Sequence, residues 1–207
     1  MQLGLSLSRG SLPLAALLLA AGPVAAEEVF TFDPGHTEIQ FAYSHLGNSR
    51  AFGAFEGFTG ELALDTDDPA RSRIEVVIDA ASLRTGVDAL DGHLKSADFF
   101  AVESSPEIRF VSTGVVPTSE TTAEVTGDLT IRETTVPVVL DVTLNYLGDH
   151  QLGQFVPDYA DMEVAGFSAR GTVLRSAFGL DLLVPMISDE VELVIEAELL
   201  RPKVLVD

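Results

Sequence analysis

The sequence contains no cysteine, and this absence excludes several kinds of chemistry. Without thiols the chain has no disulfide scaffold, no thiolate zinc site and no cysteine nucleophile. It also has no cysteine that could carry a lipid anchor. Tryptophan is absent as well, whereas phenylalanine occurs 12 times. The aromatic content is therefore mainly apolar.

Positive charge is scarce, because 12 Lys and Arg residues stand against 32 Asp and Glu residues, a net charge of -20. A nucleic-acid-binding protein needs a basic surface that releases phosphate counterions, so this composition excludes that class. Electrostatic docking on an anionic membrane is excluded for the same reason, which leaves at most a transient membrane contact. Hydrophobic residues make up 46% of the chain, too many for a disordered acidic protein.

Long hydrophobic runs are also missing, apart from a short one at the N-terminus. Arg9 precedes an apolar segment over residues 12–21, and Val24-Ala25-Ala26 offers small residues for cleavage before Glu27. The segment is too short for a hydrocarbon core about 30 Å thick, so a cleaved signal peptide over residues 1–26 is favoured over a membrane anchor. Residues 27–207 are then expected to form a single soluble domain outside the cytoplasm.

Most of the mature chain alternates between apolar and polar residues. Strict alternation is typical of half-buried antiparallel strands with one apolar face. The last run is the cleanest, since its glutamates fall on the face opposite to Val191 and Leu199. Those glutamates predict a solvated outer face, with a cationic partner as the alternative. The runs on the apolar faces are Ile39 to Tyr43, Ile74 to Ile78, Ile108 to Phe110, Val125 to Ile131, Val136 to Tyr146, and Val191 to Leu199.

One segment breaks this pattern, residues 88–100 (DALDGHLKSADFF), where Leu90, Leu94 and Ala97 follow helical spacing. We interpret it as one or two short helices inserted between strands, and no other stretch of the mature chain is expected to be helical. About eight strands and a short helix predict an all-β fold, either a closed antiparallel barrel or a sandwich. A barrel of this size has room for a small apolar ligand.

No catalytic or metal-binding constellation stands out. The chain has no Gly-x-Ser-x-Gly elbow and no phosphate-binding glycine loop. Its four histidines, His36, His45, His93 and His150, lack both the i, i+4 spacing of a zinc helix and the i, i+2 spacing of a strand site. We therefore expect no enzyme, no metal and no required cofactor.

Seven motifs stand in order along the chain and together carry a resemblance. They are Asp33–Thr37 (DPGHT), Gly53–Gly60 (GAFEGFTG), Asp91–Phe100 (DGHLKSADFF), Thr126–Ile131 (TGDLTI), Ala165–Phe167 (AGF) before Phe178–Leu180 (FGL), and Glu190–Leu193 (EVEL). In this order they resemble the YceI family of secreted, lipocalin-like proteins over about residues 30 to 200. The resemblance implies an extended antiparallel β-barrel of about eight strands with a helical insertion. It further implies a periplasmic location and a bound polyisoprenoid, an isoprenoid quinone or a prenyl phosphate.

This resemblance changes the interpretation of the phenylalanines, which composition alone assigns to an ordinary core. In a YceI-like barrel they are candidates for the wall of a hydrophobic tunnel, with Leu94, Phe99 and Phe100 as a cap from the helical insertion. Strand register is expected to turn one or two of them outward, since Phe52 and Phe58 share a face only if a glycine introduces a bulge. The wall candidates are Phe41, Phe52, Phe55, Phe58, Phe110, Phe167 and Phe178.

For a ligand headgroup, the candidates are His93, Lys95 and Asp98, with helix capping and surface solvation as the alternative. Leu90 stands where many family members carry a basic residue, and removal of Arg9 leaves 11 cations against 32 anions, a net charge of -21. A pyrophosphate would be repelled unless Lys95, Arg84 or Arg175 cluster locally. We therefore expect an uncharged isoprenoid such as a quinone.

The predicted function is a periplasmic carrier for a long-chain isoprenoid. The alternatives are a lipid-acting enzyme and a stress-related interaction protein with a filled core and no lipid ligand. The sequence leaves the oligomeric state open, with a homodimer as one option.

Overall fold

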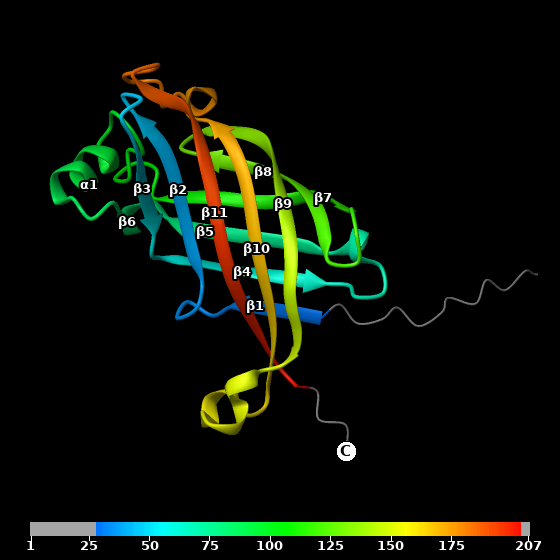
Figure 1. Ribbon diagram of the computed structural model, residues 1–207. Helices are drawn as coiled ribbons and strands as arrows, with labels where there is room; N and C mark the ends of the chain where they lie inside the picture. Colours follow the sequence, from blue (N-terminus) through cyan, green and yellow to red (C-terminus); the bar gives the residue numbers. More distant parts are fainter. Residues whose placement is uncertain (1–27, 204–207) are drawn as a thin grey trace, which may run out of the picture.

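The computed structural model describes residues 28–203 as an antiparallel β-barrel (Figure 1). Eight strands close the barrel in the order β1-β4-β5-β7-β8-β9-β10-β11, and β11 pairs back with β1. The predicted all-β barrel with a helical insertion is confirmed, whereas the predicted signal peptide lies outside the described residues. The barrel strands are β1 (Glu28–Phe32), β4 (Phe58–Leu64), β5 (Arg73–Asp79), β7 (Glu107–Pro117), β8 (Thr122–Ile131), β9 (Thr134–Asp149), β10 (Met162–Leu174) and β11 (Ile187–Pro202).

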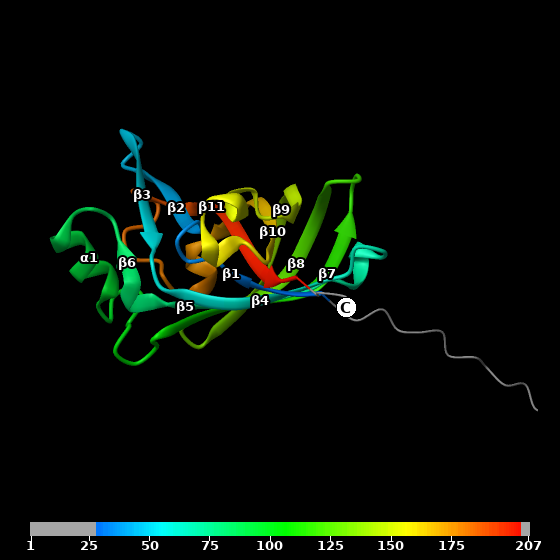
Figure 2. The same ribbon diagram turned by 90° about the horizontal axis from the view of Figure 1, so that it is seen from below.

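Strand β11 has a second partner on the edge that meets β1. Its residues 187–196 pair with β2 (Glu38–His45), and only Leu199 and Leu200 pair with β1. A branch of β2, β3 (Ser49–Phe55) and β6 (Leu83–Arg84) therefore leaves the barrel at one end. Figure 2 shows this branch diverging from β4 and β5.

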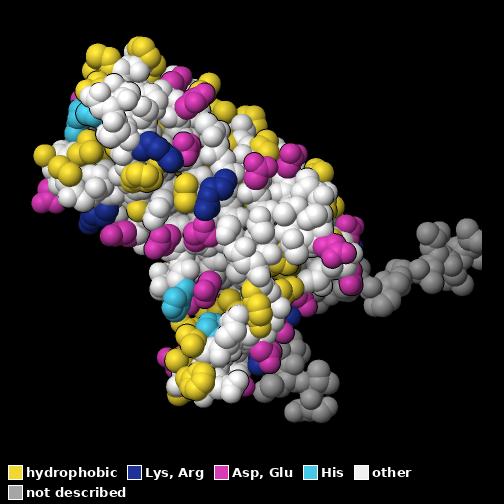
Figure 3. Space-filling view, in the orientation of Figure 1, with side chains coloured by type: hydrophobic (Ala, Val, Ile, Leu, Met, Phe, Trp, Pro, Cys, Tyr) yellow, Lys and Arg dark blue, Asp and Glu magenta, His cyan; other side chains and the backbone are white. Residues whose placement is uncertain are grey.

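The side chains of β11 alternate between the inside and the outside of the barrel, as the sequence predicts. The apolar residues from Val191 to Leu199 line the inside of the barrel. The outward Glu192 and Glu196 form ion pairs with Arg50 and Arg170. Figure 3 shows carboxylates spread over this outer surface, in agreement with a solvated face.

Strand β9 departs from the predicted alternation at its end. The register shifts between Gly166 and Phe167 of β10, which pair with Tyr146 and Leu144, so Asn145 is an extra residue on β9. Such a bulge reverses the direction of the following side chains. Leu147 consequently belongs to the cavity lining and Tyr146 does not, so the prediction that Tyr146 shares the inner face of Val136 is wrong.

The helical insertion is shorter than the segment predicted. Helix α1 spans Asp88–Lys95, and the chain then continues to Phe100 in turns. Asp91 anchors α1 to the preceding loop, because its Oδ1 accepts hydrogen bonds from the backbone N–H and the hydroxyl of Thr85. Within residues 28–203, no helix is long and apolar enough to cross a bilayer.

The expectation that no other stretch is helical is wrong, because the described residues include several single 3₁₀ turns. Short 3₁₀ turns form in loops, where a few local hydrogen bonds suffice without helical periodicity in the sequence. They are η1 (Pro69–Arg71), η2 (Ala80–Ser82), η3 (Gln151–Gln154), η4 (Pro157–Tyr159) and η5 (Arg175–Phe178).

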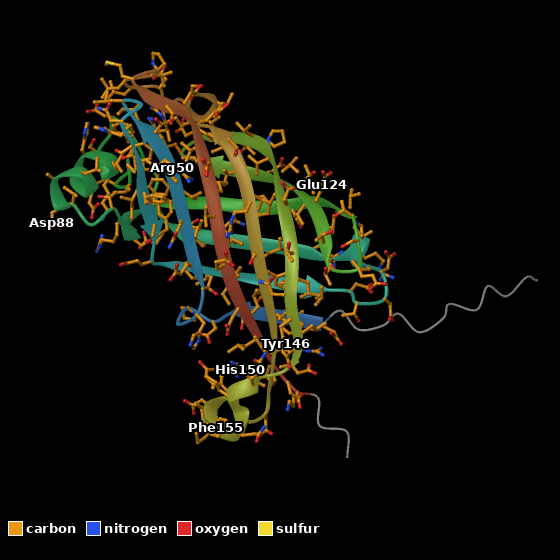
Figure 4. All side chains as sticks on the ribbon, in the orientation of Figure 1. Arg50, Asp88, Glu124, Tyr146, His150 and Phe155 are labelled. Atoms are coloured by element: carbon orange, nitrogen blue, oxygen red, sulfur yellow. The ribbon has the colours of Figure 1, made fainter. Side chains whose placement is uncertain are left out.

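The η3 and η4 turns form a lobe between β9 and β10 at one end of the molecule, and His150 and Phe155 belong to it (Figure 4). The lobe contacts the β1–β2 loop through Tyr159, whose hydroxyl donates a 3.0 Å hydrogen bond to Asp33 Oδ2. Asp33 Oδ2 also bonds to Nδ1 of His36 at 2.9 Å. Phe155 remains 79% exposed.

Two glycines allow aromatic rings to lie flat against the inner surface of the sheet. A Cβ at Gly53 would lie 2.3 Å from Cζ of Phe41, and one at Gly127 would lie 2.3 Å from Cζ of Phe110. Both distances are far below van der Waals contact. The rings therefore occupy space that any other residue would fill.

We expect Gly127→Ala to lower the free energy of unfolding by about 1–3 kcal/mol, because Phe110 has to leave its position. Chemical unfolding measures the loss. Gly114→Ala is the matched control, since no atom lies within 4 Å of a Cβ there. Equal losses in the two variants would contradict the role of the Phe110 contact.

Candidate ligand-binding cavity

The barrel encloses an apolar cavity of about 720 Å³. Its volume falls within the range of about 300–1,000 Å³ that is usual for small-molecule sites. Each barrel strand contributes inward side chains to the wall because the alternation places every second residue inside. One such residue from each strand, in barrel order from β1, is Phe32, Leu62, Val76, Phe110, Val125, Leu140, Phe167 and Leu193.

The two ends of the cavity differ in charge. Near α1 and the β10–β11 loop, the ionisable lining residues are His45, His93, Tyr43 and Arg175. Near η1 and the β7–β8 turn they are Asp65, Arg73 and Glu120. Among the described residues, the carboxylates of the lining therefore belong to one end only.

Most of the predicted wall residues lie where the sequence places them. The rings of Phe41 and Phe55 are 5.7 Å apart, and Phe100 meets Phe55 edge-on at 5.6 Å. The helical insertion thus contacts the barrel wall directly. Whether these residues touch a ligand stays a prediction. The predicted residues that line the cavity are Phe41, Phe55, Leu94, Phe99, Phe100, Phe110, Phe167 and Phe178.

Phe52 and Phe58 do not line the cavity, and their assignment to the wall is wrong. Strand β3 pairs with β2 without a register shift, so no bulge turns Phe52 inward. It is 54% exposed, with the Arg50 guanidinium 5.4 Å from its ring centroid. Phe58 packs edge-on against Phe32, at 5.7 Å, as part of the core instead.

Of the three headgroup candidates, only His93 reaches the cavity. Its ring meets Phe99 edge-on at 5.0 Å, and its Nε2 lies 3.9 Å from Oδ2 of Asp98. Asp98 and Lys95 are absent from the lining, and the Asp98 side chain is 68% exposed. Contact of these two residues with a headgroup stays a prediction, since α1 directs its Leu90, His93 and Leu94 side toward the cavity.

The three cations considered for a local cluster do not come together in the cavity. Arg84 donates to the carbonyl of Leu83 and lies 3.8 Å from Glu56, and neither it nor Lys95 belongs to the lining. Arg175 alone of the three lines the cavity, and it is 8% exposed. Nothing in the sequence signals that burial.

Arg175 and Tyr43 influence each other electrostatically. Burial lowers the pKa of Arg175, and the charges of Asp189 and Asp181 oppose this effect. Burial also raises the pKa of Tyr43, which the positive charge of Arg175 opposes. At neutral pH the pair is an arginine cation beside a protonated phenol. The alternation of β2 predicts that Tyr43 points inward, so this residue could have been found from the sequence.

A second polar cluster lies outside the cavity, where the lobe meets the β1–β2 loop. Ligand atoms of Asp33, His36 and Glu198 lie within 4.8 Å of one another. The Asp33 carboxylate already accepts hydrogen bonds from the Gly35 N–H and the Tyr159 hydroxyl, besides its contact with His36. These contacts attach the lobe to the barrel.

The electrostatics of this cluster make the β1–β2 loop, on which Tyr159 of the lobe is anchored, dependent on pH. Burial would raise the pKa of Asp33, but hydrogen bonds from His36, Gly35 and Tyr159 hold it below its ordinary 3.8. The hydrogen bond to Asp33 raises the pKa of His36 above 6.5. The Asp33 contribution is lost as pH falls through its lowered pKa, and the His36 contribution is lost as pH rises through its raised pKa. Both are fully present between about pH 3.8 and 6.5.

We expect the lobe, residues 150–161, to exchange its amide hydrogens most slowly within that pH window, after correction for intrinsic exchange. Hydrogen exchange read by mass spectrometry measures this. Tyr159→Phe removes the hydroxyl bonded to Asp33 and should speed exchange in the lobe while leaving β7 and β8 unchanged. A pH-independent protection of the lobe would contradict the assignment.

Comparison with known proteins agrees with this architecture. The model of the YceI-like domain matches residues 30–199. A UPF0312 protein of Pseudomonas savastanoi is 37% identical over 174 residues, which cover 84% of this chain and 86% of the relative. A UPF0312 protein of Pectobacterium carotovorum is 35% identical over 93% of this chain and 96% of its own length. The chain therefore belongs to the YceI family.

Solved structures show the same fold. Burkholderia cenocepacia BcnA superposes with a TM-score of 0.69 at 23% identity, over 82% of this chain and 99% of BcnA. The Campylobacter jejuni YceI protein gives 0.65 at 26% identity, over 77% and 90%. A polyisoprenoid binding domain from Saccharophagus degradans gives 0.63 at 12% identity, over 85% and 99%.

Proposed function

We propose that this protein is a non-catalytic periplasmic carrier for a long-chain isoprenoid, held in the cavity of the barrel. The observation that carries the proposal is the cavity itself, an apolar space of about 720 Å³ inside a barrel of the YceI family. Removing an isoprenoid tail from water supplies the affinity, at about 0.8 kcal/mol for each buried CH₂ before ordering costs. The polyisoprenoid-binding domain of Saccharophagus degradans, which shares the fold, supports this ligand class.

An uncharged headgroup fits the charges of the cavity better than a pyrophosphate does. Arg73 and Arg175, one at each end, are the arginines of the described lining, which includes no lysine. The lining at the Arg73 end also includes Asp65 and Glu120, and the chain carries a net charge of -20. A pyrophosphate would meet repulsion at that end and one arginine at the other. We therefore propose an isoprenoid quinone as the preferred cargo.

The two rival functions lack support from the described residues. A filled-core interaction protein requires a barrel without a tunnel, and the cavity does not fit that requirement. A lipid-acting enzyme requires a positioned base and nucleophile. Among the hydrogen bonds of residues 28–203, none joins a serine or threonine hydroxyl to a histidine ring.

Native mass spectrometry of protein purified from the periplasm without detergent tests the carrier directly. We expect a chain that begins at Glu27 together with a heavier species, and organic extraction of that species should release a polyprenyl compound. The released mass identifies the headgroup. An apo mass, followed by failure of added quinones and prenyl phosphates to bind, would rule out the carrier.

Filling the cavity from its wall tests the location of the ligand. Ala169 of β10 is buried and lines the cavity, so we expect Ala169→Phe to fold but to retain much less isoprenoid. Ala63→Phe is the matched control, since Ala63 lies between the inward Leu62 and Leu64 on the outer face of β4. Retention is measured by extraction and quantification. Equal retention in both variants would place the ligand elsewhere.

A further inference from the structure

Arg175 is a buried cation in an apolar wall, and it has no contact ion pair. Among the described residues no carboxylate oxygen lies within 4.0 Å of its guanidinium. Asp189, whose charge acts most strongly on Arg175, accepts hydrogen bonds from the N–H and the hydroxyl of Ser176 at 2.8 and 2.7 Å. A buried charge is costly unless polar partners compensate it.

Backbone carbonyls provide that compensation, but one N–H of the Arg175 guanidinium has no acceptor among the described residues. Nε donates to Ser188 O at 2.8 Å, and Nη2 donates to Ile187 O at 2.9 Å. Nη1 donates to Leu182 O at 3.0 Å and to Leu180 O. A guanidinium has five N–H groups, of which Nη2 carries two. One N–H of Nη2 has no acceptor among residues 28–203.

Tyr43 supplies a second donor beside this one. It lines the same end of the cavity, it is coupled electrostatically to Arg175, and its hydroxyl makes no hydrogen bond with another described residue. Tyr43 is half-buried and its hydroxyl retains accessible surface, so the hydroxyl is open to an acceptor in the cavity. His45 and His93 are the other ionisable residues of this end, and most of the remaining wall is apolar. Two unpaired donors at one end of the cavity mark a place for a hydrogen-bond acceptor.

We propose that Arg175 and Tyr43 form the headgroup subsite, in which the second Nη2 hydrogen and the Tyr43 hydroxyl donate to a carbonyl oxygen of the isoprenoid ligand. This assignment rests on the proposed carrier function and moves the headgroup from α1 to the wall formed by β2 and η5. Two donors suit the two lone pairs of a quinone carbonyl oxygen. A phosphate presents several anionic oxygens and would leave most of them without partners here. The subsite therefore selects isoprenoids that end in a neutral carbonyl.

The test compares three probes of related tail and different head: menaquinone with a geranylgeranyl tail, geranylgeranyl phosphate, and the hydrocarbon phytane. Each is titrated into the wild-type protein, into Tyr43→Phe and into Tyr146→Phe. The last variant is the matched control, because Tyr146 is exposed and, within residues 28–203, its hydroxyl bonds only to the carbonyl of Asp149. Arg175 is left unchanged because its four carbonyl contacts hold the β10–β11 loop.

We expect wild type to bind the quinone most tightly. Tyr43→Phe should weaken quinone binding about threefold to tenfold, the usual effect of one lost neutral hydrogen bond. It should leave phytane binding unchanged, and Tyr146→Phe should change neither. Infrared spectroscopy gives an independent readout, since a hydrogen-bonded carbonyl absorbs at lower frequency, and this shift should shrink in Tyr43→Phe alone.

The other outcomes separate the subsite from the carrier function. If the quinone and phytane bind equally and Tyr43→Phe changes nothing, the subsite is wrong while the carrier stands. If geranylgeranyl phosphate binds most tightly and Tyr43→Phe weakens its binding, the proposed preference for a neutral carbonyl headgroup is wrong. If wild type binds none of the probes, the proposed function itself fails.

Discussion

Closure of the sheet through β11 is the constraint on which this structure depends. Strand β11 pairs with β10 along nearly its whole length, while its other edge is divided between β2 and β1. Because the ring of strands is closed, the barrel backbone finds its hydrogen bonds within the sheet and needs no packed layer against it. The interior is therefore free to hold a cavity, whose size is set by side chains alone.

The wall phenylalanines show how that size is kept. Phe41 and Phe110 lie against Gly53 and Gly127, in positions that a Cβ would occupy. Large rings placed this way cover the sheet and leave the centre of the barrel open. Small residues such as Ala169 and Ala197 have the same effect at other positions of the wall. The cavity follows from the pairing of large residues with small ones across neighbouring strands.

Alternation was sufficient for the strands and for the inward direction of most wall side chains, whereas the choice of a barrel over a sandwich came from the family resemblance. Val191 and Phe110 are examples. It failed where local irregularity decides direction. The extra residue Asn145 turned Tyr146 outward, and the missing bulge in β3 left Phe52 outside. The alternation of a single strand does not show whether that strand carries a bulge. The bulge depends on how the strand pairs with its neighbour.

The site chemistry was harder to predict than the wall. His93, Lys95 and Asp98 share a motif, but only His93 faces the barrel. The position of Arg175 results from four carbonyls of a loop that follows it in the chain. Such a cluster of backbone acceptors has no sequence pattern, because any residue supplies a carbonyl. Tyr43, by contrast, follows from the alternation of β2.

The unlike ends of the cavity give the barrel a polarity. Arg175 and other donors line one end, and two carboxylates together with Arg73 belong to the lining of the other. A symmetric tunnel would hold an elongated molecule in either direction with equal energy. Under the proposed function, the acceptor-bearing end of the cargo would lie at the Arg175 end and its hydrocarbon end at the other. Such a carrier would deliver its cargo in one fixed direction, so that an acceptor protein or membrane would meet the same end of the molecule at every transfer.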